Sequence, residues 1–348
     1  MAAQKIGIIG GGRWARTIAV ELDRLLSNEV NISMHSPSNA DGLRRWVIDS
    51  GIKRIKVDNQ WPRFDDCKPF DAVIVANQAR FHFPATASAL LAGTPALVEK
   101  PFALTAVDAK SLVDMSKNSG ALLCAGHVFL FSRDIQIFAD HVVRCGSVQK
   151  IDLTWSDPAT EIRHGEQKRY DPSISVIHDV FPHILSLLRV ITSDPVEFKG
   201  LALERGGARV KLDLQVGISP CVAILERNAP ERRRVIQVET TGGSLELDFT
   251  TEPAHIRSGD AEKLISSEWR RTSGSLSTML KTFLEVVALG KCFDERLSPA
   301  FGLEAGLIID QAAEVYCEKQ GEWLSKSMHK PIDDELRYAL TERSYSLV

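Results

Sequence analysis

The fold is decided near the amino terminus by the stretch KIGIIGGGRWA at residues 5–15. Its apolar run, followed by three glycines, predicts a buried strand that turns into a helix. The pattern Gly10-x-Gly12-x-x-Ala15 provides a tight turn, a backbone without a β-carbon, and a small residue where helix meets strand. Helix amides after such a turn face an anion, which indicates a binding site for a dinucleotide pyrophosphate. Taken alone, the motif also fits an ordinary strand–helix junction.

The chain has 348 residues, a length that favours two domains over one. Its hydrophobic fraction of 44% and charged fraction of 25% are typical of a globular protein. The 42 basic and 45 acidic residues give a net charge of −3, which offers no electrostatic basis for binding nucleic acid or an anionic membrane. The only tight basic run, Arg232 to Arg234, fits a solvated turn better than a phosphate site. We therefore expect a small-molecule partner, with no nucleic acid and no membrane.

The six cysteines are scattered and include no Cys-x-x-Cys pair, so neither a zinc site nor a disulfide framework is indicated. We expect no bound metal, because no further ligand cluster accompanies His178, Asp179 and His183. No apolar stretch approaches the roughly 18 residues of a membrane-spanning helix. No charged-then-apolar leader precedes the first strand. These features predict reduced thiols and a cytoplasmic protein.

The pattern of strands changes near residue 124. Before it, short apolar segments alternate with helical sequence, which is the signature of a parallel sheet. After it, strand-like segments between residues 148 and 249 follow one another without helices, which implies an open, mostly antiparallel sheet. The fold class is therefore α/β followed by α+β. We predict a Rossmann dinucleotide-binding domain at residues 1–124 and an α+β substrate-binding and oligomerisation domain at residues 125–348, ending in a polar tail from residue 331.

Two motifs carry residues suited to chemistry. Lys100 stands between Glu99 and Pro101 at the carboxyl end of a predicted core strand, where open parallel sheets bind ligands. An isolated Glu-Lys-Pro also fits a surface strand end. Asp179 and His183 are four residues apart and share one face of a predicted helix. An imidazole exchanges protons near neutral pH and a carboxylate can fix its tautomer, while an N-cap role for Asp179 and simple packing of His183 fit equally well.

The motifs follow one another in an order that resembles one family. They are the glycine turn, Asn77 and His82, LAGTPALVEKP at 91–101, AGH at 125–127, the Asp179–His183 helix, and LSPAFGLEA at 297–305. In this order and spacing the chain resembles the glucose-fructose oxidoreductase / inositol dehydrogenase (Gfo/Idh/MocA-type) family over about residues 4–320.

This resemblance implies a nicotinamide-dependent dehydrogenase or reductase in which a Rossmann domain and an open-sheet domain frame a cleft. It further implies that Lys100 orients and polarises the reacting oxygen, that His183 is the general acid/base, and that Asp179 supports both. Such groups suit hydride transfer, because a proton is exchanged at the oxygen as the hydride moves. The resemblance also implies a homodimer or homotetramer.

The choice of cofactor depends on the end of the second strand, MHSPSN at residues 34–39. No acidic residue stands there to hold the ribose hydroxyls of NAD. Hydroxyl and basic side chains nearby favour the 2′-phosphate of NADP(H), with NAD(H) as the alternative, although Arg44 and Arg45 fit a solvated helix face equally well. The cofactor-binding candidates are Gly10, Gly12, Arg13, Trp14, Ala15, Ser36, Ser38, Arg44, Asn77, His82, Glu99 and Lys100.

Position alone assigns further substrate contacts to His127, Arg163, His164, Arg169 and Tyr170. The chain departs from the family where Ser173 and Ser175 replace frequent glycines and where Leu130 and Phe131 replace a pair that is often basic and aromatic. The apolar run at 128–131 fits core packing or a pocket for a substrate less polar than a free sugar.

We expect an oxidoreductase that transfers a hydride between nicotinamide and a small sugar-derived or polyhydroxylated alcohol or carbonyl. One alternative is an NADPH-dependent imine reductase of secondary metabolism, in which His183 or Tyr170 protonates nitrogen. The other is a regulatory protein that binds the nucleotide without turnover, since a fold does not guarantee catalysis.

Overall fold

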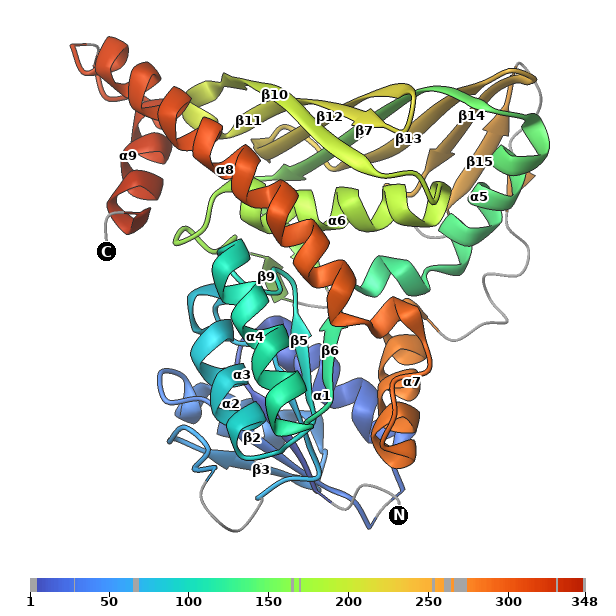
Figure 1. Cartoon of the computed structure of the whole chain (residues 1–348). Coiled ribbons are helices and arrows are strands. Elements are labelled where there is room, and N and C mark those ends of the chain that lie inside the picture. Colours follow the sequence, from blue (N-terminus) through green and yellow to red (C-terminus); the bar gives the residue numbers. More distant parts are fainter. Residues whose placement is uncertain are drawn as a thin grey trace. The chain divides into compact units, whose positions relative to one another are not determined.

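The computed structural model describes the chain except for residues 1–4, 28, 65–68, 164–165, 169, 252–253, 260–263, 266–273, 330 and 347–348. The chain divides into two compact units, of which the first comprises Met1–Phe131 and Ser273–Leu307 and the second Ser132–Thr272 and Ile308–Val348. The segment Ser273–Leu307 returns to the first unit, drawn orange beside the blue and cyan elements in Figure 1. The domains predicted from the sequence, 1–124 and 125–348, assign this segment to the second domain instead.

The first unit contains a parallel sheet in the order β3-β2-β1-β4-β5-β6. Strands β4 and β5 are buried along their whole length, which explains their continuous apolar sequence. The strand order reverses between β1 and β4, and ligands bind at the carboxyl ends of strands at such a switch point. The strands are β1 (Lys5–Ile9), β2 (Asn31–His35), β3 (Ile55–Asp58), β4 (Ala72–Val75), β5 (Ala96–Glu99) and β6 (Leu123–Gly126).

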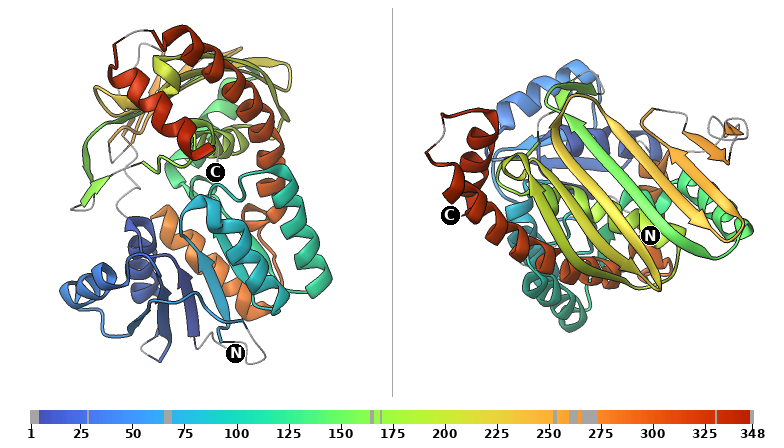
Figure 2. Two further views of the ribbon diagram at one scale, coloured as in Figure 1. Left: turned by 90° about the vertical axis from the view of Figure 1, so that its left-hand side faces the viewer. Right: turned by 90° about the horizontal axis from the view of Figure 1, so that it is seen from above.

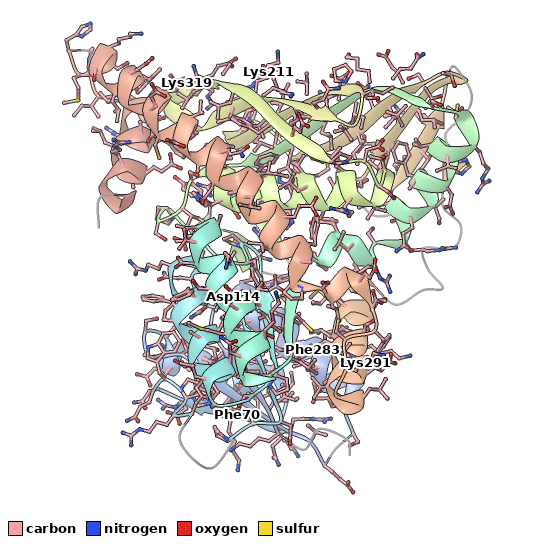
Figure 3. The ribbon with its side chains drawn as sticks, in the orientation of Figure 1. Phe70, Asp114, Lys211, Phe283, Lys291 and Lys319 are labelled. Atoms are coloured by element: carbon pink, nitrogen blue, oxygen red, sulfur yellow. The ribbon has the colours of Figure 1, made fainter. Side chains whose placement is uncertain are left out.

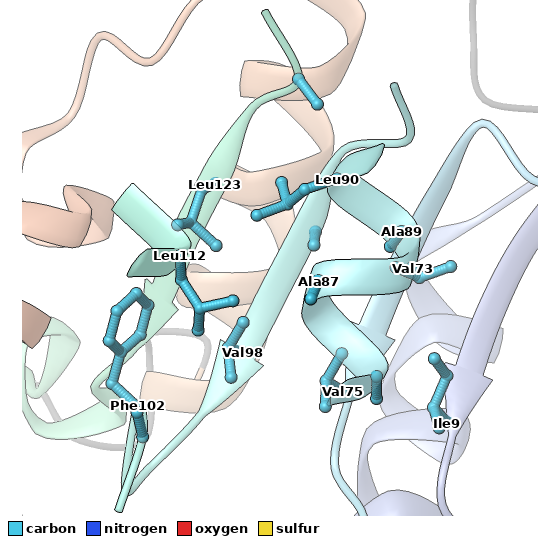
Figure 4. Close-up of a cluster of buried hydrophobic side chains, with 14 of the residues drawn as sticks. Ile9, Val73, Val75, Ala87, Ala89, Leu90, Val98, Phe102, Leu112 and Leu123 are labelled. Atoms are coloured by element: carbon cyan, nitrogen blue, oxygen red, sulfur yellow. The ribbon is translucent and has the colours of Figure 1, made fainter. Parts of the chain in front are cut away.

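Helices pack on this sheet through apolar side chains. Leu90 and Leu112 lie against Val98 and Leu123 of the sheet in the close-up of Figure 4. Leu130 and Phe131 are buried, so at these two positions the apolar run packs in the core. The helical elements are α1 (Arg13–Leu25), α2 (Ala40–Ser50), η1 (Ala79–Phe81), α3 (His82–Leu91), α4 (Ala106–Ser119), η2 (Val128–Phe131), α7 (Ser275–Leu289) and η5 (Glu295–Leu297).

The second unit is built on an eight-stranded sheet in the order β10-β11-β12-β7-β13-β14-β15-β16. Strand β7 pairs in parallel with β12, and the other neighbouring strands pair antiparallel. This confirms the predicted open, mostly antiparallel sheet. The strands are β7 (Val148–Pro158), β10 (Val196–Glu204), β11 (Arg209–Val216), β12 (Ser219–Ala229), β13 (Arg233–Thr240), β14 (Gly243–Asp248), β15 (His255–Ser258) and β16 (Leu264–Ile265), beside a separate hairpin of β8 (Glu161–Arg163) and β9 (Glu166–Lys168).

Helices α5 (Arg133–Cys145) and α6 (Val176–Ile191) lie along one face of this sheet, and the right-hand view of Figure 2 looks onto the strands from above. Exposed Lys211 of β11 stands out from the unit in Figure 3, whereas Phe283 of α7 in the first unit is buried.

Helix α8 (Pro299–Ser327) enters the second unit at residue 308, and the predicted polar tail forms helix α9 (Asp334–Ser346). Within the described residues, no helix combines the length and apolarity that a membrane span needs.

Candidate active site

The glycine turn between β1 and α1 leaves room for a pyrophosphate. Gly10 has a φ of +141°, and a Cβ there would lie 2.4 Å from the carbonyl oxygen of Ala76, so only glycine fits. Gly12 precedes α1 as its N-cap, and nothing lies within 4 Å of the position that its Cβ would occupy. Among the described residues no side chain caps the helix at this residue, so its first amides are suited to bind an anion. Ala15 is buried, as a helix packed closely on its strand requires.

Neutral side chains stand at the end of β2. His35 is buried, with its Nδ1 3.0 Å from the carbonyl oxygen of Gln60 and its Nε2 3.1 Å from Oγ of Ser33. Burial lowers the pKa of His35, although its hydrogen bond to Gln60 opposes this shift. The last residue of β2, directly before the loop proposed to contact the cofactor, is therefore an imidazole whose neutral form is favoured, and not a carboxylate.

The loop after β2 packs against the glycine turn. Ser36 is buried so close to Gly11 that a Cβ on this glycine would lie 2.4 Å from the serine Oγ. Asn39 donates a hydrogen bond from Nδ2 to the carbonyl oxygen of Gly11 at 3.2 Å. Ser38 is exposed, and exposed Arg44 pairs with Asp41 at 2.6 Å. Asn39 was not predicted as a site residue, and its amide is suited to align this loop.

A cluster of ionisable groups lies where β5 and β6 end. Glu99 is 4% exposed, and burial raises its pKa to about 7, against the opposing effects of the nearby Trp14 indole and the positive charge of Lys100. His127 follows β6 in a buried position, where burial and the Lys100 charge lower its pKa to about 4. Lys100 is half-buried and acts on both groups, and its peptide bond to Pro101 is cis. The structure thus brings the predicted residues Trp14, Glu99, Lys100 and His127 together.

His82 ties the loops after β4 and β5 to each other. Its ring is 2% exposed, with Nδ1 2.7 Å from the carbonyl oxygen of Pro101 and Nε2 3.2 Å from that of Asn77. Burial lowers the pKa of His82, so the neutral ring donates one hydrogen bond, which we assign to the closer Pro101 oxygen. These contacts give His82 a positioning role beneath the strand ends.

The side chain of Asn77 is suited to a polar part of a cofactor. Both its Oδ1 and its Nδ2 are buried, and neither has a hydrogen-bond partner among the described residues. Buried amides are normally satisfied, and a carboxamide or a ribose hydroxyl offers both the donor and the acceptor that this side chain lacks. Together with the glycine turn, this amide fits a bound dinucleotide.

In the second unit, the amino-terminal half of α6 presents Asp179 and His183. Ser175 is the N-cap of this helix and accepts a hydrogen bond from the His178 amide at 3.4 Å, so the N-cap alternative for Asp179 is wrong. Asp179 instead accepts a hydrogen bond from Nη2 of Arg227 at 3.0 Å. Both Asp179 and His183 are half-buried.

The ring of His183 stacks on Trp155 of β7, with centroids 4.9 Å apart and planes inclined by 16°. The guanidinium carbon of Arg234 lies 3.7 Å from the Trp155 ring centroid. Asp157 accepts hydrogen bonds from both the Trp155 indole and Arg234. Arg234 is 1% exposed, so the interpretation of its basic run as a solvated turn is wrong at this residue.

The other residues predicted to contact the substrate lie in different parts of the second unit or outside the described residues. The ring centroid of Tyr170 lies 4.7 Å from the guanidinium carbon of Arg227. Arg163 is the last residue of β8, whereas His164 and Arg169 lie outside the described residues. In the part of the chain that the structure describes, no three His, Cys, Asp or Glu side chains gather as a metal site.

Comparison with known proteins relates the amino-terminal domain to one family. Residues 4–127 match the model of a family described as an oxidoreductase family with an NAD-binding Rossmann fold. The amino-terminal domain of this chain is therefore similar to that of the Gfo/Idh/MocA oxidoreductase family. The match confirms the resemblance and the predicted class, an oxidoreductase with a nucleotide-binding Rossmann fold. A curated relative, the uncharacterized oxidoreductase YdgJ of Escherichia coli K12, is 24% identical over 222 residues, which span 59% of this chain and only 58% of that protein.

Solved structures of Gfo/Idh/MocA-type enzymes share the fold over most of the chain. The 3-ketoreductase KijD10 of Actinomadura kijaniata, in complex with TDP-benzene and NADP, has a TM-score of 0.73 at 18% identity and covers 89% of this chain and 96% of its own. UDP-N-acetylglucosamine 3-dehydrogenase GnnA of Acidithiobacillus ferrooxidans has a TM-score of 0.68 at 19% identity, over 89% and 97%. The aldose-aldose oxidoreductase of Caulobacter crescentus has a TM-score of 0.70 at 17% identity, over 90% and 98%. The predicted fold class is thereby confirmed.

Proposed function

We propose that this protein transfers a hydride between NADP(H) and a small sugar-derived or polyhydroxylated alcohol or carbonyl. The observation that carries the proposal is the placement of Lys100 at the carboxyl edge of the Rossmann sheet, where it acts on the buried groups Glu99 and His127. An ammonium group held at this edge is suited to polarise an oxygen, and the edge is where such sheets bind their cofactor. Support for a sugar substrate comes from the names of KijD10 and GnnA, which act on a keto group and on a nucleotide-linked sugar.

This function assigns a separate role to each group of residues. The glycine turn and the first amides of α1 would hold the pyrophosphate, and the amide of Asn77 would hydrogen-bond a polar group of the cofactor. Lys100 donates a hydrogen bond to the reacting oxygen, and His183 gives or takes the proton of that oxygen. Asp179 supports the two groups electrostatically. The bound nicotinamide supplies or accepts the hydride.

The preference for NADP(H) rests on the end of β2. Here the last residue of the strand is the buried His35 rather than an acidic residue, and Ser36, Ser38 and Asn39 after it offer hydroxyl and amide groups. The exposed pair of Arg44 with Asp41 costs little to break, because such pairs contribute about 1 kcal/mol or less. Arg44 is therefore able to turn toward a 2′-phosphate.

The test begins with parallel fluorescence titrations of NADPH and NADH. A panel of nucleotide sugars, keto-sugars, polyols and cyclic imines is then added to the better-bound cofactor, and nicotinamide absorbance reports turnover. We expect turnover with the sugar class and, for Lys100→Met, a fall in kcat of about 10²- to 10⁴-fold that exceeds any change in the Kd of NADPH. The exposed Lys117→Met on α4 is the matched control.

Each alternative has its own outcome. Turnover of cyclic imines alone would replace the proposal with the imine reductase, and tight binding without any turnover would favour the regulatory protein. Unchanged kcat in Lys100→Met would remove the catalytic role of this lysine, and the absence of binding to either nucleotide would overturn the proposal as a whole.

A further inference from the structure

A single guanidinium on β12 holds the start of helix α6. Arg227 is 1% exposed, and its Nη2 donates to Oδ2 of Asp179 at 3.0 Å and to the carbonyl oxygen of Ser175 at 3.3 Å. Its Nη1 donates to the carbonyl oxygen of Ile174 at 2.8 Å. The rigid, planar fork of an arginine fixes the directions of these bonds relative to one another. The orientation of Arg227 therefore restricts the position of the Asp179 carboxylate, which accepts one of these bonds.

The carboxyl-terminal helix α9 holds the other side of this guanidinium. Oε1 of Glu342 lies 3.6 Å from Nη1 of Arg227. The same carboxylate accepts hydrogen bonds from the hydroxyl of Tyr338 at 3.1 Å, from Nε2 of Gln320 at 2.7 Å, and from the hydroxyl of Tyr316. Glu342 is 3% exposed, so it is a fully hydrogen-bonded buried carboxylate. Two carboxylates from two helices thus share one buried guanidinium.

Simple docking of α9 does not require this network. Leu336 and Ala339 of α9 already pack against Leu324 of α8 in an apolar cluster. Taking charges out of water is costly, and buried ion pairs often add little to stability compared with apolar contacts. A buried, fully paired network instead restricts orientation, which suits a group that must be held in one place.

The network also includes a predicted substrate residue. The ring of Tyr170 lies against the guanidinium of Arg227 at 4.7 Å and against the ring of Tyr338 at 6.0 Å. Residues from α9 therefore contact Tyr170 directly and reach Asp179 through Arg227.

We propose that Arg227 is a positioning residue for Asp179 and Tyr170, and that Glu342 of the carboxyl-terminal helix α9 fixes the orientation of Arg227. Helix α9 is by this inference part of the apparatus that holds the substrate side of the active site. The inference rests on the proposed function for the role of Asp179, but the geometry of the network stands independently.

The test compares two carboxylates on the same helix. Glu342→Gln removes the buried charge. Glu335→Gln is the matched control, because Glu335 lies on the same helix with its side chain 43% exposed and forms a loose pair with Arg205 at 3.7 Å. We measure the Kd of NADPH, kcat and KM for the substrate, and hydrogen exchange at residues 170–179. For Glu342→Gln we expect unchanged NADPH affinity, a fall in kcat/KM of about tenfold or more, and at least fivefold faster exchange at residues 170–179. The control stays within twofold of the native protein in all of them.

A double-mutant cycle separates positioning from general damage. In an Asp179→Asn, Tyr170→Phe background, Glu342→Gln should cost little further activity, because the proposed effect passes through these two residues. The inference would be overturned if the losses of kcat/KM in the cycle were additive. It would also be overturned if amide hydrogen exchange at residues 170–179 were as slow in Glu342→Gln as in the native protein. If Glu342→Gln does not fold, Tyr338→Phe, which removes one donor to Glu342, replaces it in the same measurements. If the native protein turns over no substrate, the proposed function fails and the exchange data alone decide on the network.

Discussion

The imidazole ring of His183 lies parallel to the indole of Trp155, at a centroid distance of 4.9 Å. The indole is itself held in place, because its Nε1 donates to Oδ2 of Asp157 at 3.2 Å and the guanidinium of Arg234 lies over its ring. A stacked ring keeps its plane while its nitrogens lie at the edge of the stack. Trp155 is therefore suited to hold the proposed acid/base group in one orientation.

Loss of the Trp155 ring should lower turnover without affecting the cofactor. We expect Trp155→Leu to reduce kcat about tenfold or more, because a proton-transfer group that can rotate is less often in the productive geometry. The Kd of NADPH should not change. Steady-state kinetics and NADPH fluorescence titrations measure the two effects.

Trp155→Phe is the matched variant, since it keeps an aromatic face against His183 and removes the indole N–H. It should keep most of the activity. Equal losses in the leucine and phenylalanine variants would show that the hydrogen bond to Asp157, and not the stack, matters for His183.

Replacement of Glu99 by glutamine should stabilise the protein at high pH. The folded-state pKa of Glu99 is raised from 4.5 to about 7 by burial, so the folded state binds the proton more tightly than the unfolded state. The stability cost of this carboxylate is absent below pH 4.5 and grows as the pH rises to about 7. We expect Glu99→Gln to gain about 2 kcal/mol more at pH 8 than at pH 5, as measured by urea unfolding. The exposed Glu318→Gln on α8 is the control, and a pH-independent gain in Glu99→Gln would contradict the prediction.

His127 should have the opposite pH dependence. Burial and the Lys100 charge lower its folded-state pKa from 6.5 to about 4, so the unfolded state binds the proton more tightly. Its cost is absent above pH 6.5 and grows as the pH falls toward 4. The free energy of unfolding of the native protein should therefore fall by about 2 kcal/mol more than that of His127→Gln when the pH is lowered from 8 to 5. Parallel slopes for the two proteins in urea unfolding would exclude this account.

The features of the first unit that the sequence predicts correctly depend on neighbouring residues. The positive φ of Gly10, the buried Ala15 and the position of Glu99 at a strand end follow from turn chemistry and from a continuous apolar strand. Each of these arises within a few residues of the chain. The local geometry of the glycine turn and of the strand end was predictable for this reason, while the binding role of these residues stays a prediction.

The missed residues depend on pairing between distant strands. Trp155 and Arg234 stand opposite each other because β7 and β13 pair in one register, and a shift of one residue would turn Arg234 to the other face. Arg227 likewise meets Glu342 only because helix α9 folds back on the sheet, where the sequence indicated a polar tail. Alternation along a strand shows that one face is buried but does not show which distant residues meet there.

A negative charge at Ser38 should reduce the preference for NADPH. Ser38 is exposed in the loop after β2, so an aspartate fits there without disturbing the contact of Ser36 with Gly11. Its carboxylate would repel a 2′-phosphate and accept hydrogen bonds from the ribose hydroxyls of NADH. We expect Ser38→Asp to weaken NADPH binding about tenfold, or about 1.4 kcal/mol, while NADH binding is unchanged or tighter.

Ser38→Asn is the matched control, because it has the same shape without the charge, and its Kd for NADPH should stay within twofold of the native value. The effect should shrink at high salt, because exposed charges are screened. Equal weakening of both cofactors in Ser38→Asp would instead show that the loop, and not the charge, had changed, and would remove Ser38 from the phosphate site.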